Sequence, residues 1–240
     1  MYFEQLNFRV NFNNADFSEL RFPEEDKKIL RELGKQVAEI AARPIMDERI
    51  KLWIKHNKLE KTRPLVLCDP ENGWNELITD DQVTCKNSIA QHWENYLRKL
   101  IFWGNEMNDD FIVEAKFPVP HVYKEKLWGV AGSKKKGSEK KTKEDGGSYH
   151  IETILEDYSQ IKDITKPSFD IDYKATDIML EQAKEIFDGY LDVSLNTVWY
   201  WSVGLTDEFT FLRGMDKLFY DFYDEPEGVH AVMQLLYEGT

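Results

Sequence analysis

The spacing of apolar residues predicts a chain built mainly from amphipathic helices. Six segments place an apolar residue at every third or fourth position, which is the spacing of one helix face. These predicted helices span residues 23–42, 46–57, 88–106, 173–187 and 206–214, with a last one starting near 224. A proline followed by acidic residues suits the start of the first helix, and Asp172 and Thr206 are placed to cap later ones.

Three short apolar runs lie between the helices and predict strands. They are Leu65–Cys68, Phe111–Val113 and Leu191–Leu195. The first is a continuous apolar run between two prolines, which fits a strand buried on both faces. Pro118 and Pro120 exclude a regular central strand just after the second run. Short strands that alternate with helices predict an α/β fold with a parallel sheet, and ligands bind at the carboxyl ends of the strands in such folds.

Composition and charge argue against several kinds of partner, namely nucleic acid, membrane and metal. The 240 residues carry a formal net charge of −13, which argues against a nucleic-acid partner. We expect no membrane association, because no run of about 18 apolar residues and no signal-peptide pattern occurs. Cys68 and Cys85 belong to no Cys-x-x-Cys motif or Cys/His cluster, which favours a reducing, cytoplasmic location. The five histidines lack the spacing of a helical metal site.

Residues 132–148 form one low-complexity segment, GSKKKGSEKKTKEDGGS. Its six lysines outweigh three acidic residues and give the segment a net charge of +3. No aromatic residues are interleaved with the lysines, as they are in segments that bind single-stranded nucleic acid. The composition therefore predicts a flexible surface loop.

The stretch RPLVLCDPENGWNEL, residues 63–77, carries the first group of candidate site residues. Asp69, Asn72, Trp74 and Glu76 follow the first predicted strand. One interpretation is a Pro-Glu-Asn-Gly turn with a helix cap after it. The other is the active-site end of a strand, where these polar side chains and the tryptophan hold a substrate. The pattern alone leaves both open.

The second group of candidates follows the other two predicted strands. Glu114 comes directly after Phe111–Val113, where apolar walls would raise its pKa for proton transfer; a salt-bridged glutamate is the alternative. His121 follows Pro120 near the expected mouth of the site and is a candidate to contact a substrate. The alternative is a surface or helix-capping role. Trp199 and Trp201 follow the third strand and form either an aromatic wall against a ligand or part of the core.

Three stretches, in this order, resemble the uroporphyrinogen decarboxylase superfamily. They are RPLVLCDPENGWNEL, the DDFIVEAKFPVPHVY that follows the long helix, and residues 191–236 with an Asp-x-Pro-Glu-x-Val-His element at 224–230. The similarity covers roughly residues 25–240. It points to the decarboxylase-like branch of the family, near the corrinoid-dependent methyltransferases, and implies a (β/α)8 TIM-type barrel.

The resemblance also implies a function and a set of site residues. The chain would be the N-terminal part of a decarboxylase-like enzyme, a methyltransferase or lyase linked to corrinoid-dependent methyl transfer, with Glu114 and Asp69 as catalytic residues. The substrate-binding residues would be Asn72, Trp74, Glu76, His121, Trp199 and Trp201. Methyltransferases of the family bind zinc through a His-x-Cys and a later Cys, and true decarboxylases use an arginine loop and an aspartate. This chain has neither motif, and Glu114 stands near the place of the aspartate.

Length sets the expected extent of the barrel. Residues 1–60 suit an N-terminal helical extension, and residues 61–240 suit about three βα units, whereas a complete barrel takes about 250 residues. We expect the missing half-barrel to come from the parent protein, another chain or a homo-oligomer. The substrate would be a small molecule or a corrinoid protein, and zinc and a corrinoid would serve the parent protein.

In this reading the chain alone binds no metal or cofactor and has no turnover. Two alternatives stay open. One is decarboxylation of a tetrapyrrole-like polycarboxylate, and the other is a non-catalytic half-barrel that serves assembly.

Overall fold

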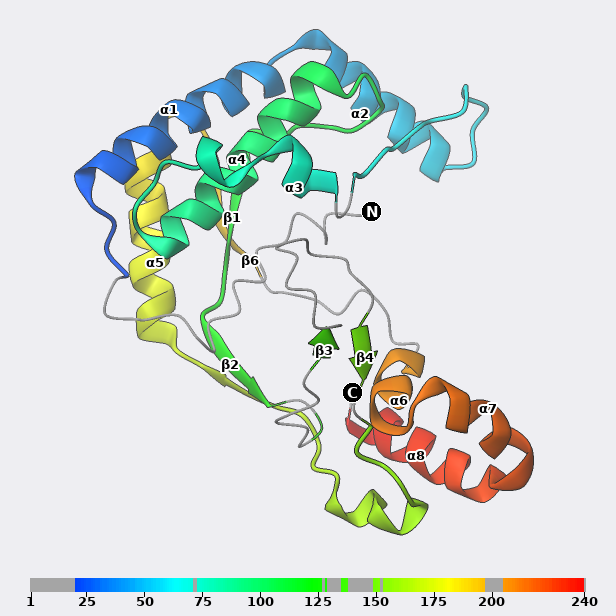
Figure 1. The fold of residues 1–240 in the computed structure, drawn as a ribbon. Coiled ribbons are helices and arrows are strands. Elements are labelled where there is room, and N and C mark those ends of the chain that lie inside the picture. The colour runs from blue at the N-terminus through cyan, green and yellow to red at the C-terminus, as the bar shows by residue number, and fades with distance from the viewer. Residues whose placement is uncertain are drawn as a thin grey trace. The chain divides into compact units, whose positions relative to one another are not determined.

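The chain is α/β and mostly helical, with a small parallel sheet. A computed structural model describes residues 20–70, 73–126, 128, 135–137, 149–151, 153–196 and 205–239 (Figure 1). The chain divides into two compact units. Unit 1 comprises residues 1–122 and 172–198, and unit 2 comprises residues 123–171 and 199–240. The predicted domain boundary at residue 60 falls inside unit 1.

Unit 1 contains four long helices that the apolar spacing predicts. α1 spans Glu24–Ala41, α2 Pro44–Asn57, α4 Ser88–Glu106 and α5 Tyr173–Phe187, while the short α3 spans Trp74–Leu77 and the 3-10 turn η4 spans Asp80–Gln82. The long helices begin and end within two residues of their predicted ranges, so these predictions are confirmed. Asp172 caps α5 as expected, because its carboxylate accepts the N–H of Ala175.

Two parallel strands, β1 (Lys116–Pro120) and β6 (Asp192–Asn196), form the sheet of unit 1. β6 confirms the strand predicted at residues 191–195. The strand predicted at residues 111–113 is wrong, because the strand begins at residue 116 and continues through both prolines. The fold is therefore α/β with a parallel pair of strands, as expected, but the first of them starts later in the sequence.

The ladder geometry explains why two prolines fit in β1. The Asp192 N–H donates to the carbonyl oxygen of Ala115 at 2.8 Å. Backbone groups alternate sides along a strand, so this bond directs the N–H groups of Phe117 and the other odd-numbered residues of β1 toward β6. Pro118 and Pro120 have no N–H and face the opposite edge, so they remove no hydrogen bond from the pair.

The strand predicted at Leu65–Cys68 is wrong, and so is its burial. No strand within the described ranges pairs with this segment, and Val66 is 58% exposed. Two carboxylates stand in for a partner strand: Asp110 Oδ2 accepts the Val66 N–H at 2.8 Å, and Asp109 Oδ2 accepts the Cys68 N–H at 3.0 Å. Side chains thus accept two N–H groups of this run, while the Val66 carbonyl accepts the backbone N–H of Asp110, an arrangement that hydrophobicity does not signal.

Aromatic rings between the helices and β1 form the centre of the core of unit 1. The ring of Phe117 lies 4.9 Å from that of Trp93 in α4 and 4.3 Å from that of Phe187 in α5, measured between centroids. All three side chains are fully buried. Gly34 lets α1 approach this cluster, since a Cβ there would lie 2.7 Å from a ring carbon of Phe187. This packing fixes β1, and with it the residues that follow the strand.

Unit 2 consists of two antiparallel strand pairs and a helical cluster. β2 (Tyr123–Lys126) pairs with β5 (Ser168–Ile171), and β3 (Lys135–Gly137) pairs with β4 (Tyr149–Ile151). The 3-10 helix η5 spans Tyr158–Asp163, α6 spans Thr206–Arg213, α7 spans Met215–Asp224 and α8 spans Pro226–Gly239. The buried apolar residues of this unit are Trp128, Leu155, Phe209, Leu212, Leu218, Val229, Val232 and Leu236.

Unit 2 departs from the predictions at three places. α7 is absent from the predicted elements, although its apolar residues recur at helical spacing, and most of them lie at the surface. Thr206 is the first residue of α6 rather than its cap, and Leu205 precedes it with a φ of 59°. Three residues of the lysine-rich segment 132–148 form β3, and the other residues of that segment lie outside the described ranges.

Candidate functional site

The carboxyl ends of β1 and β6 lie side by side in unit 1. Pro120, the last residue of β1, is paired with Asn196, the last residue of β6. The chain between the two strands includes α5, so the strands and this helix make up a β-α-β arrangement (Figure 1). Parallel sheets bind their ligands beyond this edge, where backbone ends and helix starts provide polar groups. The residue that follows Pro120 is His121, one of the candidates from the sequence.

His121 lies at this edge with one unsatisfied ring nitrogen. Its Nδ1 atom is buried and has no hydrogen-bond partner among the described residues. The ring meets the ring of Tyr173 edge-on, with centroids 6.3 Å apart. A buried polar atom without a partner costs free energy, so such an atom marks a place where a ligand could supply the missing hydrogen bond.

The first turn of α5 fixes the backbone next to His121. The Val122 N–H donates to Thr176 Oγ1 at 2.9 Å, and the Val122 carbonyl accepts the Asp172 N–H at 2.8 Å. Both Val122 and Thr176 are buried. The loop that carries His121 is therefore held on both sides, by β1 before it and by α5 beside it. A residue held in this way keeps its ring in place for a ligand.

Glu114 does not lie at this edge, and the position expected for it is wrong. It precedes β1, so it lies toward the amino end of the strand, away from His121. Its carboxylate pairs with Lys116 Nζ at 2.7 Å, and this pairing raises the pKa of Lys116. The structure thus shows the salt-bridged glutamate of the alternative interpretation. The later start of β1 is the reason for the difference.

The residues that follow Cys68 form a turn whose tryptophan is part of the core. The Gly73 N–H donates to the Pro70 carbonyl at 2.8 Å, and Trp74 begins α3. The buried Trp74 ring donates its Nε1–H to Asp69 Oδ1 at 2.9 Å. Glu76 is exposed. Of the two interpretations of this stretch, the geometry matches the turn followed by a helix.

Lys99 adds a cation to this part of unit 1. Its Nζ lies 5.6 Å from the centre of the Trp74 ring, a cation–π distance. Burial lowers the pKa of Lys99, while the Asp69 carboxylate acts in the opposite direction. The ammonium thus balances the negative charge of Asp69, and the sequence alone did not single out this lysine.

The remaining candidates fall into two groups. Asn72, Trp199 and Trp201 lie outside the described residues. Cys68, at the end of the run predicted to be a strand buried on both faces, is exposed. The described residues therefore bring only His121 to the carboxyl edge of the sheet, and they place Asp69 and Trp74 together at a separate turn.

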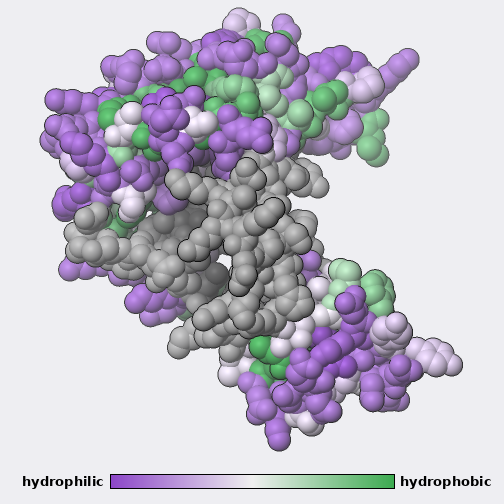
Figure 2. Space-filling view, viewed as in Figure 1, coloured by the Kyte–Doolittle hydropathy of each residue, from purple (hydrophilic) through white to green (hydrophobic). Residues whose placement is uncertain are grey.

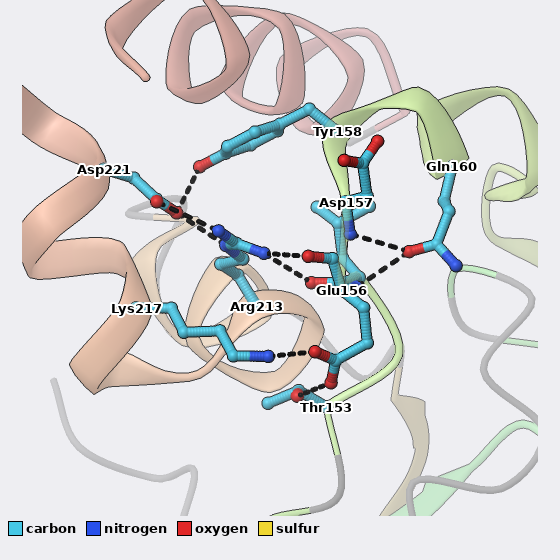
Figure 3. Close-up of polar contacts among 9 residues, drawn as sticks. Thr153, Glu156, Asp157, Tyr158, Gln160, Arg213, Lys217 and Asp221 are labelled. Carbon is cyan, nitrogen blue, oxygen red and sulfur yellow. Dashed lines mark hydrogen bonds and ion pairs between the residues drawn. The ribbon is translucent and has the colours of Figure 1, made fainter. Parts of the chain in front are cut away.

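Unit 2 contains a buried polar cluster that the sequence did not reveal (Figure 3). Arg213 donates to Asp221 through Nε at 2.5 Å and through Nη2 at 2.9 Å, and the Tyr158 hydroxyl donates to the same carboxylate at 2.7 Å. Arg213 also donates to the carbonyl oxygens of Leu155 and Glu156 at 3.1 and 2.6 Å. Burial raises the pKa of Tyr158 above its ordinary value.

This cluster connects η5 to α6 and α7 through bonds among its own side chains and the backbone of Leu155 and Glu156. The Arg213 guanidinium holds the pKa of Asp221 below its ordinary value. Arg213 and Asp221 are eight residues apart on two helices separated by Gly214, a spacing that no helical pattern singles out. We therefore interpret the cluster as a structural connection of unit 2.

Neither metal sites nor membrane spans occur in the part of the chain that the structure describes. No group of three or more His, Cys, Asp or Glu side chains there could hold a metal ion. No described helix is both long enough and apolar enough to cross a membrane. No protein-family model matches the chain, and comparisons with curated proteins and with solved structures find no match.

Proposed function

We propose that this chain is the first part of a uroporphyrinogen decarboxylase-like (β/α)8 enzyme and that its substrate binds beside His121. One observation carries the proposal: His121 follows β1 at the carboxyl edge of a parallel strand pair, and its buried Nδ1 has no partner among the residues that the structure describes. This edge is where parallel α/β proteins bind their ligands. The sequence resemblance adds the family and the reaction class, a methyl transfer linked to a corrinoid.

The chemistry of His121 narrows the ligand. An imidazole nitrogen can accept a hydrogen bond from a hydroxyl or thiol, or donate one to a carboxylate when it carries the proton. The Tyr173 ring beside it favours a ligand with some apolar surface. A ligand that carries a carboxylate, amide, hydroxyl or thiol beside an apolar surface meets both conditions. In the enzyme His121 would orient the substrate or exchange a proton with it, with Nδ1 as the reacting atom.

The metal that the resemblance implies does not fit the described residues. They contain no set of three side chains with the right donors for zinc. We therefore assign no step to zinc in this chain. The corrinoid enters the proposal as a substrate carried by another protein.

Binding can be measured on the chain as it is. Methylcobalamin represents the corrinoid, and coproporphyrin represents the tetrapyrrole of the alternative decarboxylase. Each is titrated into isotope-labelled protein while the histidine ring resonances are followed by NMR. The proposal expects methylcobalamin to shift the His121 resonances, with no turnover. A shift of the His121 resonances with coproporphyrin and not with methylcobalamin would favour the decarboxylase.

Two variants separate a site from a general effect. His121→Ala should weaken binding about 10-fold, which is the loss of one hydrogen bond to a buried group. His56→Ala is the matched control, because His56 is an exposed histidine on α2 of the same unit. The proposal is wrong if neither ligand moves the His121 resonances, or if both variants bind equally well.

A second candidate function is a half-barrel that serves assembly. Val66, Leu67 and Leu195 are exposed apolar side chains in unit 1. Another chain that completes the barrel would cover such residues. Binding of the dye ANS to the purified chain tests this idea. A chain that melts cooperatively, stays monomeric and binds no ANS would exclude the assembly role.

A further inference from the structure

α7 exposes large apolar side chains along most of its length. Five of its ten residues form what we call the α7 face: Met215, Phe219, Tyr220, Phe222 and Tyr223. Phe219 is 68% exposed and Tyr223 is 90% exposed. Leu218 and Asp221, on the other side of the helix, are buried and hold α7 in unit 2. Figure 2 shows pale green, apolar surface beside the helices at this end of the chain.

The size of the α7 face is unusual for a surface without a partner. A buried aromatic side chain contributes about 150–250 Å². At the observed exposures the five side chains present about 700 Å² of surface, above the few hundred Å² that a monomer ordinarily exposes in one patch. Each partner in an interface of standard size buries about 800 Å². The α7 face is thus close to one side of a complete interface.

The chemistry of the face favours a protein over a lipid surface. Aromatic residues and methionine are enriched at protein interfaces. Helices that lie on membranes carry lysine and arginine next to their apolar face. Here Asp216, Asp224 and Glu225 are exposed at the two ends of α7, and the one lysine of the helix, Lys217, is paired with Glu156. Anionic lipid would be repelled by these carboxylates.

We propose that the α7 face is the surface through which two copies of this chain associate, with the two α7 helices packed antiparallel. A two-fold interface needs one patch that complements itself, and its area here matches what a dimer requires. The antiparallel arrangement places Asp224, at the carboxyl end of one α7, near the amino end of the other, where the helix dipole attracts a carboxylate and Asp216 repels it.

Sedimentation equilibrium of the complete chain tests the proposal. The wild-type chain should form a concentration-dependent dimer. The double variant Phe219→Ser/Tyr223→Ser removes two large side chains that are exposed in the monomer, so its fold should be unaffected. Its dissociation constant should rise by at least about 30-fold, since central aromatic residues dominate such interfaces. The single variant Tyr223→Ser should give a smaller change in the same direction.

Leu59→Asn is the matched control. Leu59 is 95% exposed in unit 1 and has a φ of 59°, which asparagine tolerates. This variant removes exposed apolar surface elsewhere and should leave the dissociation constant within about two-fold of wild type.

Hydroxyl-radical footprinting locates the interface. Oxidation of Tyr220 and Tyr223 should decrease as the protein concentration rises, while oxidation of Tyr190 in unit 1 should not change. A chain that stays monomeric up to about 0.5 mM would overturn the proposal, since that limit excludes all but the weakest association. A dimer that persists in the double variant, or that leaves the α7 tyrosines unprotected, would overturn it as well.

Discussion

The ion pair between Arg213 and Asp221 makes a sharp test of what holds unit 2 together. In Asp221→Asn the side chain keeps its shape but loses the charge that faces Arg213. Both residues are buried, and Asp221 accepts three hydrogen bonds, two from Arg213 and one from Tyr158. The guanidinium then remains in the interior without a counter-charge, with the carbonyl oxygens of Leu155 and Glu156 and the one oxygen of the new amide as acceptors.

The expected cost follows from that burial. Removing one partner of a buried ion pair typically destabilises a protein by about 3–5 kcal/mol. The two carbonyl contacts remain and asparagine still offers one oxygen, so we expect about 3 kcal/mol for unit 2. This is a large fraction of the 5–15 kcal/mol by which ordinary domains are stable. A loss of about 3 kcal/mol should therefore populate open states of unit 2 measurably.

The pH dependence gives the same residue a second readout. Arg213 lowers the pKa of Asp221 in the folded state below the ordinary 3.8. The pair therefore contributes its stability above pH 3.8 and loses it as the pH falls through the lowered pKa. Wild-type unit 2 should lose stability over that range, and Asp221→Asn should lack this part of the acid dependence.

Hydrogen exchange measured on peptides of α6 to α8 reports the stability of unit 2 separately from unit 1. Glu238→Gln is the control. It removes an ion pair with Lys166 in the same unit, where both side chains are half exposed and lie 3.1 Å apart. Such a surface pair contributes about 0.5 kcal/mol or less.

Replacing both partners separates charge from packing. Arg213→Met with Asp221→Leu should regain part of the stability lost in Asp221→Asn, because no charge is left unpaired in the interior. The regain stays incomplete, since the Tyr158 hydroxyl and two carbonyl oxygens lose their partner. A change below about 0.5 kcal/mol in Asp221→Asn would refute the reasoning, and the cluster would then be solvated rather than buried.

Two further predictions concern unit 1. Arg63 and a backbone N–H lower the pKa of the buried Asp110 to about 2. This carboxylate should therefore stabilise unit 1 by about 1–2 kcal/mol above pH 4, and the stabilisation should be lost as the pH falls toward 2. Acid unfolding curves check this, because Asp110→Asn should lack the transition. Gly34→Ala should cost about 1–3 kcal/mol, because the new Cβ would lie 2.7 Å from the Phe187 ring, whereas Gly73→Ala, 3.5 Å from its nearest neighbour, should be near neutral in urea unfolding.

The sequence predicted the helices well because their information is local. An apolar stripe every three or four residues determines a helix wherever the stripe can be buried. α4 shows this directly, since Trp93, Leu97 and Leu100 lie on one face and are all buried. α7 shows the limit of the rule, because its apolar residues lie at the surface and the pattern does not distinguish a core from an interface.

The strands were harder to predict because their partners are distant in the sequence. Leu65–Cys68 has the hydrophobicity of a central strand, but its N–H groups are taken by Asp109 and Asp110, more than 40 residues away. β1 has two prolines and the appearance of a loop, yet its ladder uses only the odd-numbered residues. The local sequence pattern predicts neither the absence of a strand at residues 65–68 nor the presence of β1.

The candidate site residues also differ in whether local sequence information was enough to predict them. His121 was singled out from the sequence because it lies in the segment that follows the second predicted strand, but the strand that actually ends beside it, β1, was not predicted there. Glu114 was placed wrongly because its position depends on where β1 starts. The Arg213–Asp221 pair has no local signal, since its two residues belong to different helices and face each other only after α6 and α7 have packed.

The edges of the β1–β6 pair bear on how a barrel could be completed. The Asp192 bond to Ala115 directs the N–H groups of Val193 and the other odd-numbered residues of β6 away from β1, so that edge offers a full set of backbone donors to a further strand. The opposite edge, on β1, has prolines at two of its three outward positions and can supply only the N–H of Lys116.

A strand that joined β1 there would form few ladder bonds. In unit 1 the apolar run before Cys68 is instead held by the side chains of Asp109 and Asp110. If the chain is part of a barrel, as we propose, these two carboxylates supply hydrogen bonds that a neighbouring strand would otherwise supply to the run. The buried positions of Asp109 and Asp110 agree with that role, because a carboxylate that replaces a strand partner must be shielded from water to compete for the backbone N–H groups.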